Sequence, residues 1–191
     1  MSNPLVFATG NKSKFYEAST IAAKFSIELE QVKVAVDEIQ HHEPIEITKA
    51  KVKAAWSQLQ KPLVVNDSSW AIPALGGFPG GYMKDVTNWL STEDFMNLMK
   101  GKDDRRMILS EVVAYYDGNT LNMFTHEREG FFHTEPKGES LPTFARLVEM
   151  HGENMTIAQV FDKGNWDTGS AERYKHWYDF YEWYVNRESV Q

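Results

Sequence analysis

The sequence predicts an α/β fold, with a mixed sheet and flanking helices, from two observations. Short apolar runs alternate with segments whose apolar residues recur every three or four positions, which is the pattern of strands followed by helices. The turn sequence Asp117-Gly118-Asn119-Thr120 lies between two strand-like segments, residues 108–116 and 121–125, and indicates a hairpin. We therefore expect parallel strands together with one antiparallel pair.

The first half of the chain predicts three strands and two helices. In order, we expect a strand over residues 5–8, a helix over about 13–25, a strand over 29–36, a helix over 44–59 and a strand over 62–65. Pro44 fits the first turn of its helix, where a missing N–H costs nothing. The polar run 66–69 indicates that the last of these strands ends at Val65.

The second half begins with loop sequence and ends with an aromatic helix. Residues 74–82 contain four glycines and a proline, which interrupt regular structure. Helical sequence resumes near Lys84 and again over 92–99, before the hairpin. A last helix over 172–186 would carry the following side chains on one face: Tyr174, Trp177, Tyr178, Tyr181 and Val185. These aromatic side chains could pack in the core or in a dimer interface. The alternative is that they stack on nucleobases.

Size and composition favour one globular domain over residues 1–191. Apolar residues make up 42% and charged residues 25% of the chain. No apolar run approaches the roughly 20 residues that a membrane span needs, and we expect no signal peptide. The absence of cysteine excludes disulfides and thiolate metal sites and fits the cytoplasm. The net charge of −7 argues against nucleic acid as a partner and leaves a small anionic ligand possible.

The turn after the first strand has the chemistry of a phosphate site. It reads Thr9-Gly10-Asn11-Lys12-Ser13-Lys14 and leads directly into a helix. The first N–H groups of a helix lack intrahelical partners and favour an anion, and two lysines would add full positive charge. The alternative is an ordinary turn between strand and helix, with both lysines in water.

Two acidic residues follow predicted strands and are candidate magnesium ligands. Asp67 follows residues 63–65, and Glu38 follows the strand that ends near Val36. Two carboxylates from separate strand ends suit Mg²⁺, which shares its remaining positions with water and phosphate. A single Asp at a strand end is otherwise a helix cap or a turn residue. Lys49 is a candidate phosphate contact from the helix that begins at Pro44. A zinc site at His41-His42 is not expected, because no further ligand stands at a suitable spacing.

Three segments in this order resemble the inosine triphosphate pyrophosphatase family. They are Phe7-Ala8-Thr9-Gly10-Asn11-Lys12-Ser13-Lys14, Leu63-Val64-Val65-Asn66-Asp67-Ser68-Ser69 and Ala74-Leu75-Gly76-Gly77-Phe78-Pro79-Gly80-Gly81-Tyr82-Met83-Lys84. Weaker similarity includes Pro136-Lys137-Gly138. The resemblance implies an elongated mixed sheet, two lobes around a central cleft and a homodimer. It also implies a Mg²⁺-dependent hydrolase that converts nonstandard purine nucleoside triphosphates to monophosphate and pyrophosphate.

The resemblance also implies roles for individual residues. Contacts to the triphosphate fall on Thr9, Gly10, Asn11, Lys12, Lys14 and Lys84, and Ser68 would stand next to the substrate. The metal ligands would be Glu38 and Asp67. Asp67 would also be the general base, and Lys49 would be the catalytic lysine that contacts the phosphates from the following helix. Phe144, Lys163 and Arg173 would be further substrate contacts.

The chain departs from the family pattern at three places. Asn66 stands where the family has a second acid beside Asp67. Leu141-Pro142-Thr143-Phe144-Ala145-Arg146 replaces a segment in which an aspartate contacts the base, and Ala171-Glu172-Arg173 replaces a Ser-His-Arg motif. We therefore expect a nucleoside triphosphate pyrophosphohydrolase with altered base specificity. The alternatives are a nucleotide-binding or regulatory protein with weakened catalysis, and a pyrophosphatase for pyrimidine or modified deoxynucleotides.

Overall fold

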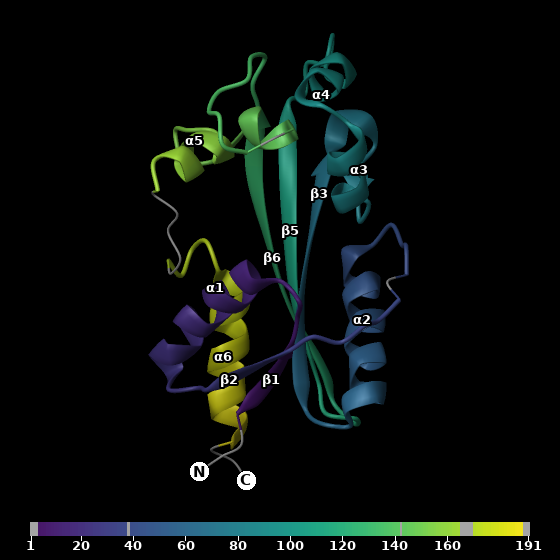
Figure 1. The fold of residues 1–191 in the computed structure, drawn as a ribbon, viewed down its shortest axis with the longest axis vertical. Helices are drawn as coiled ribbons and strands as arrows, with labels where there is room; N and C mark the ends of the chain where they lie inside the picture. Colours follow the sequence, from purple (N-terminus) through teal and green to yellow (C-terminus); the bar gives the residue numbers. More distant parts are fainter. Residues whose placement is uncertain (1–3, 38, 142, 165–169, 189–191) are drawn as a thin grey trace. The chain divides into compact units, whose positions relative to one another are not determined.

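The computed structural model describes residues 4–37, 39–141, 143–164 and 170–188, which form a mixed sheet with helices (Figure 1). The strands are β1 (Leu5–Ala8), β2 (Leu29–Val32), β3 (Leu63–Ile72), β4 (Phe78–Gly80), β5 (Arg106–Tyr116), β6 (Leu121–Phe132) and β7 (Val148–Met150). Their order is β2-β1-β3-β5-β6-β7, and β4 pairs with β3. The expected α/β fold with a mixed sheet is confirmed.

The predicted helices are present in the predicted order. The helices are α1 (Lys12–Ala22), α2 (Pro44–Leu59), α3 (Met83–Trp89), α4 (Thr92–Leu98), α5 (Ile157–Asp162) and α6 (Lys175–Glu188), with short 3-10 turns η1 (Ala23–Phe25), η2 (Pro73–Leu75) and η3 (Thr143–Arg146). α1 ends at Ala22, three residues before the predicted end, and α5 was not predicted. In the described part of the chain, none of these helices has the length and apolar character needed to cross a membrane. The predicted bounds of the helix from Pro44 to Leu59 are confirmed.

The chain folds as two compact units, in accord with the two lobes that the resemblance implied. Unit 1 holds residues 1–67, 111–126 and 168–191, and unit 2 holds residues 68–110 and 127–167. The single domain over residues 1–191 and the cleft stay predictions.

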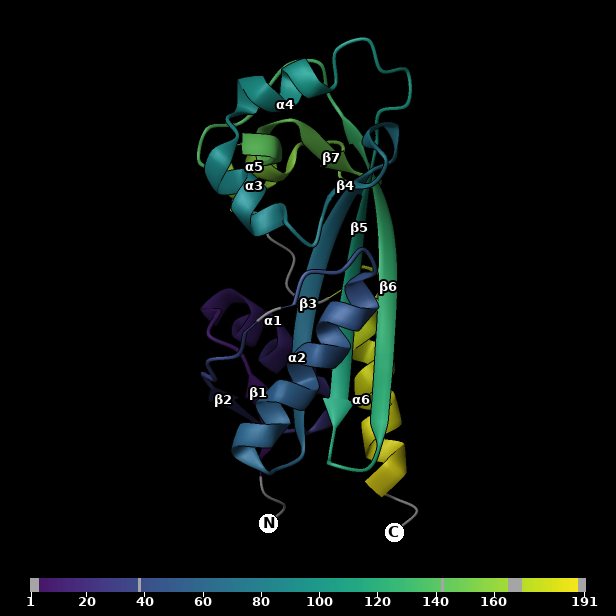
Figure 2. The same ribbon diagram turned by 90° about the vertical axis from the view of Figure 1, so that its right-hand side faces the viewer.

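In unit 1, three parallel strands are covered by helices on both faces. Leu5 pairs with Leu29, and Phe7 pairs with Val64, so that β1 lies between β2 and β3. Figures 1 and 2 show α2 along one face of these strands and α6 along the other. Side chains alternate between the faces, because successive residues of a strand point in opposite directions. Val64 contributes to the core beneath α1 and α6, whereas Val65 contributes to the core beneath α2.

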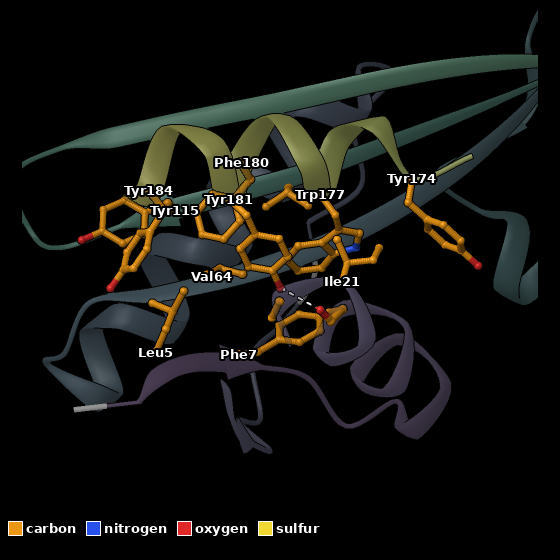
Figure 3. Close-up of a cluster of buried hydrophobic side chains, with 13 residues drawn as sticks. Leu5, Phe7, Ile21, Val64, Tyr115, Tyr174, Trp177, Phe180, Tyr181 and Tyr184 are labelled. Atoms are coloured by element: carbon orange, nitrogen blue, oxygen red, sulfur yellow. Dashed lines mark hydrogen bonds between the residues drawn. The ribbon is translucent and has the colours of Figure 1, made fainter. Parts of the chain in front are cut away.

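The aromatic stripe of α6 forms the larger core of unit 1 (Figure 3). Trp177 packs edge-on against Phe7, with ring centroids 5.1 Å apart. The hydroxyl of Tyr181 donates a hydrogen bond of 3.0 Å to the carbonyl of Ala18 in α1. Core packing is therefore confirmed for Tyr174, Trp177 and Tyr181, which are all buried. The helix begins at Lys175, three residues later than predicted.

The predicted end of the third strand at Val65 is wrong. β3 continues through the polar run to Ile72, because its last residues pair with β4, with Ile72 opposite Phe78. The side chain of Asn66 is buried and donates a hydrogen bond of 3.2 Å to the carbonyl of Val112. This bond satisfies a polar group inside the sheet. β4 also occupies part of the predicted loop 74–82, and β2 ends at Val32 instead of residue 36.

Unit 2 has its own core between α3, α4 and the strands β5 to β7. Its largest fully buried side chains include Phe95, Met107 and Phe132. β7 pairs antiparallel with β6, with Gly130 opposite Met150. The predicted hairpin is confirmed. At its turn, the Asp117 carboxylate accepts hydrogen bonds from the backbone N–H groups of Asn119 and Thr120.

Candidate active site

The turn between β1 and α1 is closed by its own side chains. The Asn11 carboxamide oxygen accepts hydrogen bonds from the backbone N–H groups of Ser13 (2.9 Å) and Lys14 (3.2 Å). The Thr9 hydroxyl accepts one of 3.1 Å from the N–H of Asn11. Asn is a favoured residue at this capping position because its oxygen reaches these N–H groups. The expectation that the first N–H groups of the helix are unpaired is therefore wrong for Ser13 and Lys14. Positive charge at this turn comes instead from the side chains of the lysines.

Asp67 lies beside this turn although it stands inside a strand. Phe7 pairs with Val64 in parallel, so Asn66 and Asp67 lie beyond the last residue of β1, level with the turn. The ammonium of Lys14 is 3.3 Å from the carbonyl oxygen of Asn66 and 4.0 Å from Oδ1 of Asp67. Asp67 therefore lies close to the turn between β1 and α1, as expected. It does so although β3 does not end there but continues to Ile72.

Lys51 provides a second cation at Asp67. Its ammonium lies 3.3 Å from Oδ2 of Asp67, and both side chains are partly buried. The sequence indicated Lys49 for this position, but the Lys49 ammonium lies 3.3 Å from the carboxylate of Glu46 on the same helix. Two residues along a helix correspond to a rotation of roughly 200°, so Lys49 and Lys51 leave different faces of α2.

A signal for Lys51 was present in the sequence. Lys51 stands four residues after Ile47 and four residues before Ala55, and both of these side chains are buried. Residues four apart lie on the same helical face. A lysine in line with two apolar residues is directed toward the sheet and not toward water, which distinguishes it from Lys49.

Burial and nearby charges act on Lys14 in opposite directions. Burial lowers the pKa of the Lys14 ammonium, the Asp67 carboxylate raises it, Lys51 lowers it, and Glu111 and Glu17 raise it. The net effect is a lowered pKa, because removal from water disfavours the charged form. The carboxylates around Lys14 therefore help to keep it charged.

Lys33 is a further cation that the sequence analysis did not identify. Its side-chain methylene groups lie over Gly10, where an added Cβ would be 3.6 to 3.7 Å from them. The carbonyl of Thr9 accepts a hydrogen bond of 3.2 Å from the Gln31 amide. Lys33 and Lys12 are both exposed. Gln31 near the end of β2 and Lys33 just after it thus lie against the turn, and a contact between segments this far apart in the sequence cannot be read from a local motif.

Of the two predicted magnesium ligands, Asp67 lies among the described residues. Glu38 lies outside the described residues. Among the described residues, His, Asp and Glu side chains form no group of three or more that could hold a metal. Mg²⁺ commonly takes only one or two protein carboxylates and completes its shell with water and phosphate. Asp67 is therefore compatible with such a site.

The other predicted contacts are divided between the two units. Ser68 follows Asp67 in β3, and Lys84 is exposed in the first turn of α3. Lys163 is exposed at the end of α5. These three residues belong to unit 2, whereas Arg173 belongs to unit 1. The guanidinium of Arg173 lies 5.9 Å from the centre of the Tyr174 ring.

Phe144 in unit 2 is held by two other rings. Its centroid is 5.0 Å from that of Trp70 and 6.1 Å from that of Phe95. Phe144 is only partly buried, so that stacking of its ring on a base stays a prediction. His41 accepts a hydrogen bond of 3.0 Å from the N–H of Glu43 through Nδ1, which is a local turn contact.

Comparison with known proteins gives similarity over nearly the whole chain. Residues 5–164 match the model of the Ham1 family. The dITP/XTP pyrophosphatase of Methanopyrus kandleri is 32% identical over 179 residues, which cover 91% of this chain and 95% of that protein. The inosine triphosphate pyrophosphatase of Aspergillus oryzae is 30% identical over 186 residues, covering 96% and 94% respectively.

Solved structures show the same fold. A HAM1 protein from Coxiella burnetii superimposes with a TM-score of 0.80 at 16% identity, covering 97% of this chain and all of that one. The Ham1 protein of Staphylococcus aureus gives a TM-score of 0.75 at 19% identity, with the same coverage.

Proposed function

Because this chain belongs to the Ham1 family, we propose that it is a hydrolase that converts nucleoside triphosphates to the monophosphate and pyrophosphate. Its relatives include a dITP/XTP pyrophosphatase and an inosine triphosphate pyrophosphatase. The observation that supports the proposal most directly is the Asp67 carboxylate between the ammonium groups of Lys14 and Lys51, beside the turn after β1. A carboxylate for proton transfer and cations for phosphate charge are the groups that this reaction needs.

The proposed substrates are nonstandard purine nucleoside triphosphates, with a base preference that differs from that of the relatives. Residues 141–146 support this proposal, because they lack the aspartate that the family uses at the base. A site that loses a hydrogen-bonding group changes its discrimination strongly. Triphosphates of pyrimidines or of modified deoxynucleosides are the alternative substrates.

In the proposed reaction, a water oxygen attacks the α-phosphorus. Asp67 accepts the proton of this water, the bond from the α-phosphorus to the bridging oxygen breaks, and pyrophosphate leaves with the bonding electrons. Mg²⁺, held by Asp67 and Glu38, would neutralise phosphate charge and lower the pKa of bound water. Lys14 and Lys51 stabilise the charge that develops on the leaving pyrophosphate.

We assign the catalytic lysine of α2 to Lys51 and not to Lys49. Lys51 lies 3.3 Å from the proposed general base, whereas Lys49 is paired with Glu46. An ammonium beside Asp67 can turn toward a phosphate oxygen of the substrate without a change in the backbone, because the lysine side chain is long and flexible.

The remaining contacts are proposals from the family resemblance. Thr9, Gly10, Asn11 and Lys12 would hold phosphate oxygens, together with Lys84, and Ser68 would stand next to the substrate. Phe144, Lys163 and Arg173 would contact the nucleoside. The homodimer and the cytoplasmic location stay predictions.

The test is incubation of the purified protein with a panel of nucleoside triphosphates and Mg²⁺. The panel includes dITP, XTP, ITP and the standard nucleotides, and the products are separated so that pyrophosphate is distinguished from phosphate. We expect pyrophosphate from at least one triphosphate, loss of turnover in EDTA and recovery with added Mg²⁺. Folded protein that binds a nucleotide and releases no pyrophosphate from any of them would instead support the binding-protein alternative.

A further inference from the structure

We propose that Trp70 of β3 is a positioning residue that holds the Phe144 ring in the orientation in which it stacks on a purine base. The inference rests on the proposed function for the contact between Phe144 and the base, whereas the contact between the two rings is independent of that function. Trp70 directly follows the motif that ends at Ser69, and the family resemblance gave it no role.

The rings of Trp70 and Phe144 meet edge to face inside unit 2. Their centroids are 5.0 Å apart, and their planes are inclined at 62°. Aromatic pairs favour this arrangement, because the positive edge of one ring then meets the negative face of the other. The contact therefore favours one tilt of the Phe144 ring over others.

The backbone around Phe144 is held by hydrogen bonds that do not orient its side chain. Phe144 lies in the 3-10 turn η3. Before it, the carbonyl of Thr143 accepts a hydrogen bond of 3.0 Å from the Thr92 hydroxyl. After it, Nε of Arg146 donates a hydrogen bond of 2.8 Å to the carbonyl of Gly138. These bonds hold the two ends of the turn, so the tilt of the ring between them depends on the side chains packed against it.

Phe95 also packs against Phe144, from the interior of unit 2. Its ring centroid is 6.1 Å from that of Phe144, and its side chain is fully buried in the core. Trp70, like Phe144, is only partly buried and lies at the margin of that core. Phe95 therefore supports the Phe144 ring from within, whereas Trp70 contacts it at the margin, where a ligand can approach.

The residue opposite Trp70 in the neighbouring strand has no side chain. Trp70 pairs with Gly80 of β4, and residues directly opposite each other in an antiparallel pair are the ones whose side chains touch. Apart from the chain neighbours of Gly80, the carbonyl oxygen of Gly77 is the one described atom within 4 Å of a Cβ added there, at 3.7 Å. The indole thus has no cross-strand side chain of β4 to pack on, so its contact with Phe144 matters more for the position of both rings.

The tilt of Phe144 matters because a ring that stacks on a base must lie nearly parallel to it. Residues 141–146 lack the aspartate that the family uses at the base, so stacking supplies a larger share of base binding in this chain. A purine has two fused rings and loses more stacking area than a pyrimidine when the tilt is wrong. Trp70 thus acts on the affinity for the base and not on the affinity for the phosphates.

The experiment measures the binding of two probes by calorimetry in the presence of Mg²⁺. One probe is the α,β-methylene analogue of ITP, which carries a base and phosphates, and the other is inorganic triphosphate, which lacks a base. Trp70→Leu removes the ring, and Trp70→Phe keeps one. Trp89→Leu, at a tryptophan of α3 that is 72% exposed, is the matched control. Trp70→Met replaces Trp70→Leu if the latter does not fold.

We expect the Kd of the ITP analogue to rise about three- to tenfold in Trp70→Leu, which is part of the contribution of one stacked base. The Kd of inorganic triphosphate should change by less than about twofold, and Trp89→Leu should equal the wild type for both probes. Trp70→Phe should lie closer to the wild type than Trp70→Leu does. A merely structural role of Trp70 would weaken both probes together or neither of them, and either result overturns the proposal.

Combination with Phe144→Leu shows whether Trp70 acts through Phe144. We expect Phe144→Leu alone to weaken binding of the ITP analogue, and Trp70→Leu to add less than about twofold in that background. Effects that multiply in full would mean that Trp70 acts on the base by itself, which contradicts a positioning role. In urea denaturation, the same four proteins should give a coupling of about two- to tenfold in the unfolding equilibrium constant, the range of an aromatic pair. A coupling factor of one also contradicts the proposal.

Binding separates this inference from the proposed function, because it needs no turnover. If the Trp70 variants bind as expected but the wild type releases no pyrophosphate from any triphosphate, the positioning role stands and the proposed hydrolysis fails. If the wild type hydrolyses a triphosphate and Trp70→Leu leaves the Kd of the ITP analogue unchanged, the hydrolase stands and the positioning role fails.

Discussion

Asp67 contacts two lysines that come from different helices. Lys14 belongs to α1 and Lys51 to α2, so the carboxylate joins the turn after β1 to the helix on the opposite face. The family resemblance indicated Asp67 and Lys14 from local motifs. It did not indicate Lys51, because the motif does not specify which face of α2 a lysine leaves, whereas the buried Ile47 and Ala55 four residues to either side do.

Replacement of Asp67 by Asn should abolish turnover and leave the fold intact. The amide cannot accept the proton of the attacking water, so we expect pyrophosphate release to fall by about 10³-fold or more. The Asp67 side chain is partly exposed, so its ion pairs contribute little to stability, and the free energy of unfolding should change by less than about 2 kcal/mol. Turnover and urea denaturation measure the two effects, and an unaltered rate removes Asp67 from the mechanism.

Lysine-to-methionine variants of α2 discriminate between the two candidate cations. We expect Lys51→Met to lower kcat/KM by about 10²-fold, as expected for the loss of a positioned charge. Lys53→Met changes an exposed lysine of the same helix and is the control. Lys49→Met should have the smaller effect, since its ammonium pairs with Glu46. A larger loss in Lys49→Met would support the assignment made from the resemblance.

Among the helices and strands, the ends of helix α2 were predicted more accurately than the end of strand β3. The spacing of apolar residues and Pro44 fixed α2 at both of its ends. β3 was predicted too short, because Asn66, Asp67 and two serines resemble a turn. These residues lie inside β3, which has β1, β5 and β4 as neighbours, and the Asn66 side chain has a buried partner in the carbonyl of Val112. Such pairing is a property of the neighbouring strand and cannot be inferred from the residues themselves.

The loop Pro136-Lys137-Gly138 provides a test of local packing in unit 2. Gly138 has φ +85°, and a Cβ there would lie 2.7 Å from the backbone nitrogen of Gln159. Gly152 has nearly the same φ, +87°, but nothing lies within 4 Å of its added Cβ. Both Gly→Ala variants incur backbone strain, and only Gly138→Ala also clashes.

We therefore expect Gly138→Ala to lower the free energy of unfolding by about 2 kcal/mol more than Gly152→Ala does. Chemical denaturation of the two variants measures the difference. Equal destabilisation would show that the close approach of the loop to α5 is not maintained in solution.

For the whole molecule, binding of a triphosphate should stabilise the folded state. A ligand present at about 100 times its Kd adds roughly 2.7 kcal/mol, which for a chain of this length raises Tm by about 5–10 °C. We expect this shift with Mg²⁺ and a triphosphate whose α,β-bridging oxygen is replaced by a methylene group. The corresponding nucleoside, which lacks the phosphates, should give a much smaller shift. Equal shifts would argue against binding through the phosphates.

The proposed reaction is tested most directly by identifying which phosphorus atom of the triphosphate the water attacks. Turnover in water enriched in ¹⁸O places the label in whichever product contains the attacked phosphorus, and mass spectrometry identifies it. Attack at the α-phosphorus, activated by Asp67, predicts label in the nucleoside monophosphate and none in the pyrophosphate. Label in pyrophosphate, or release of single phosphates that carry it, would contradict the proposed reaction.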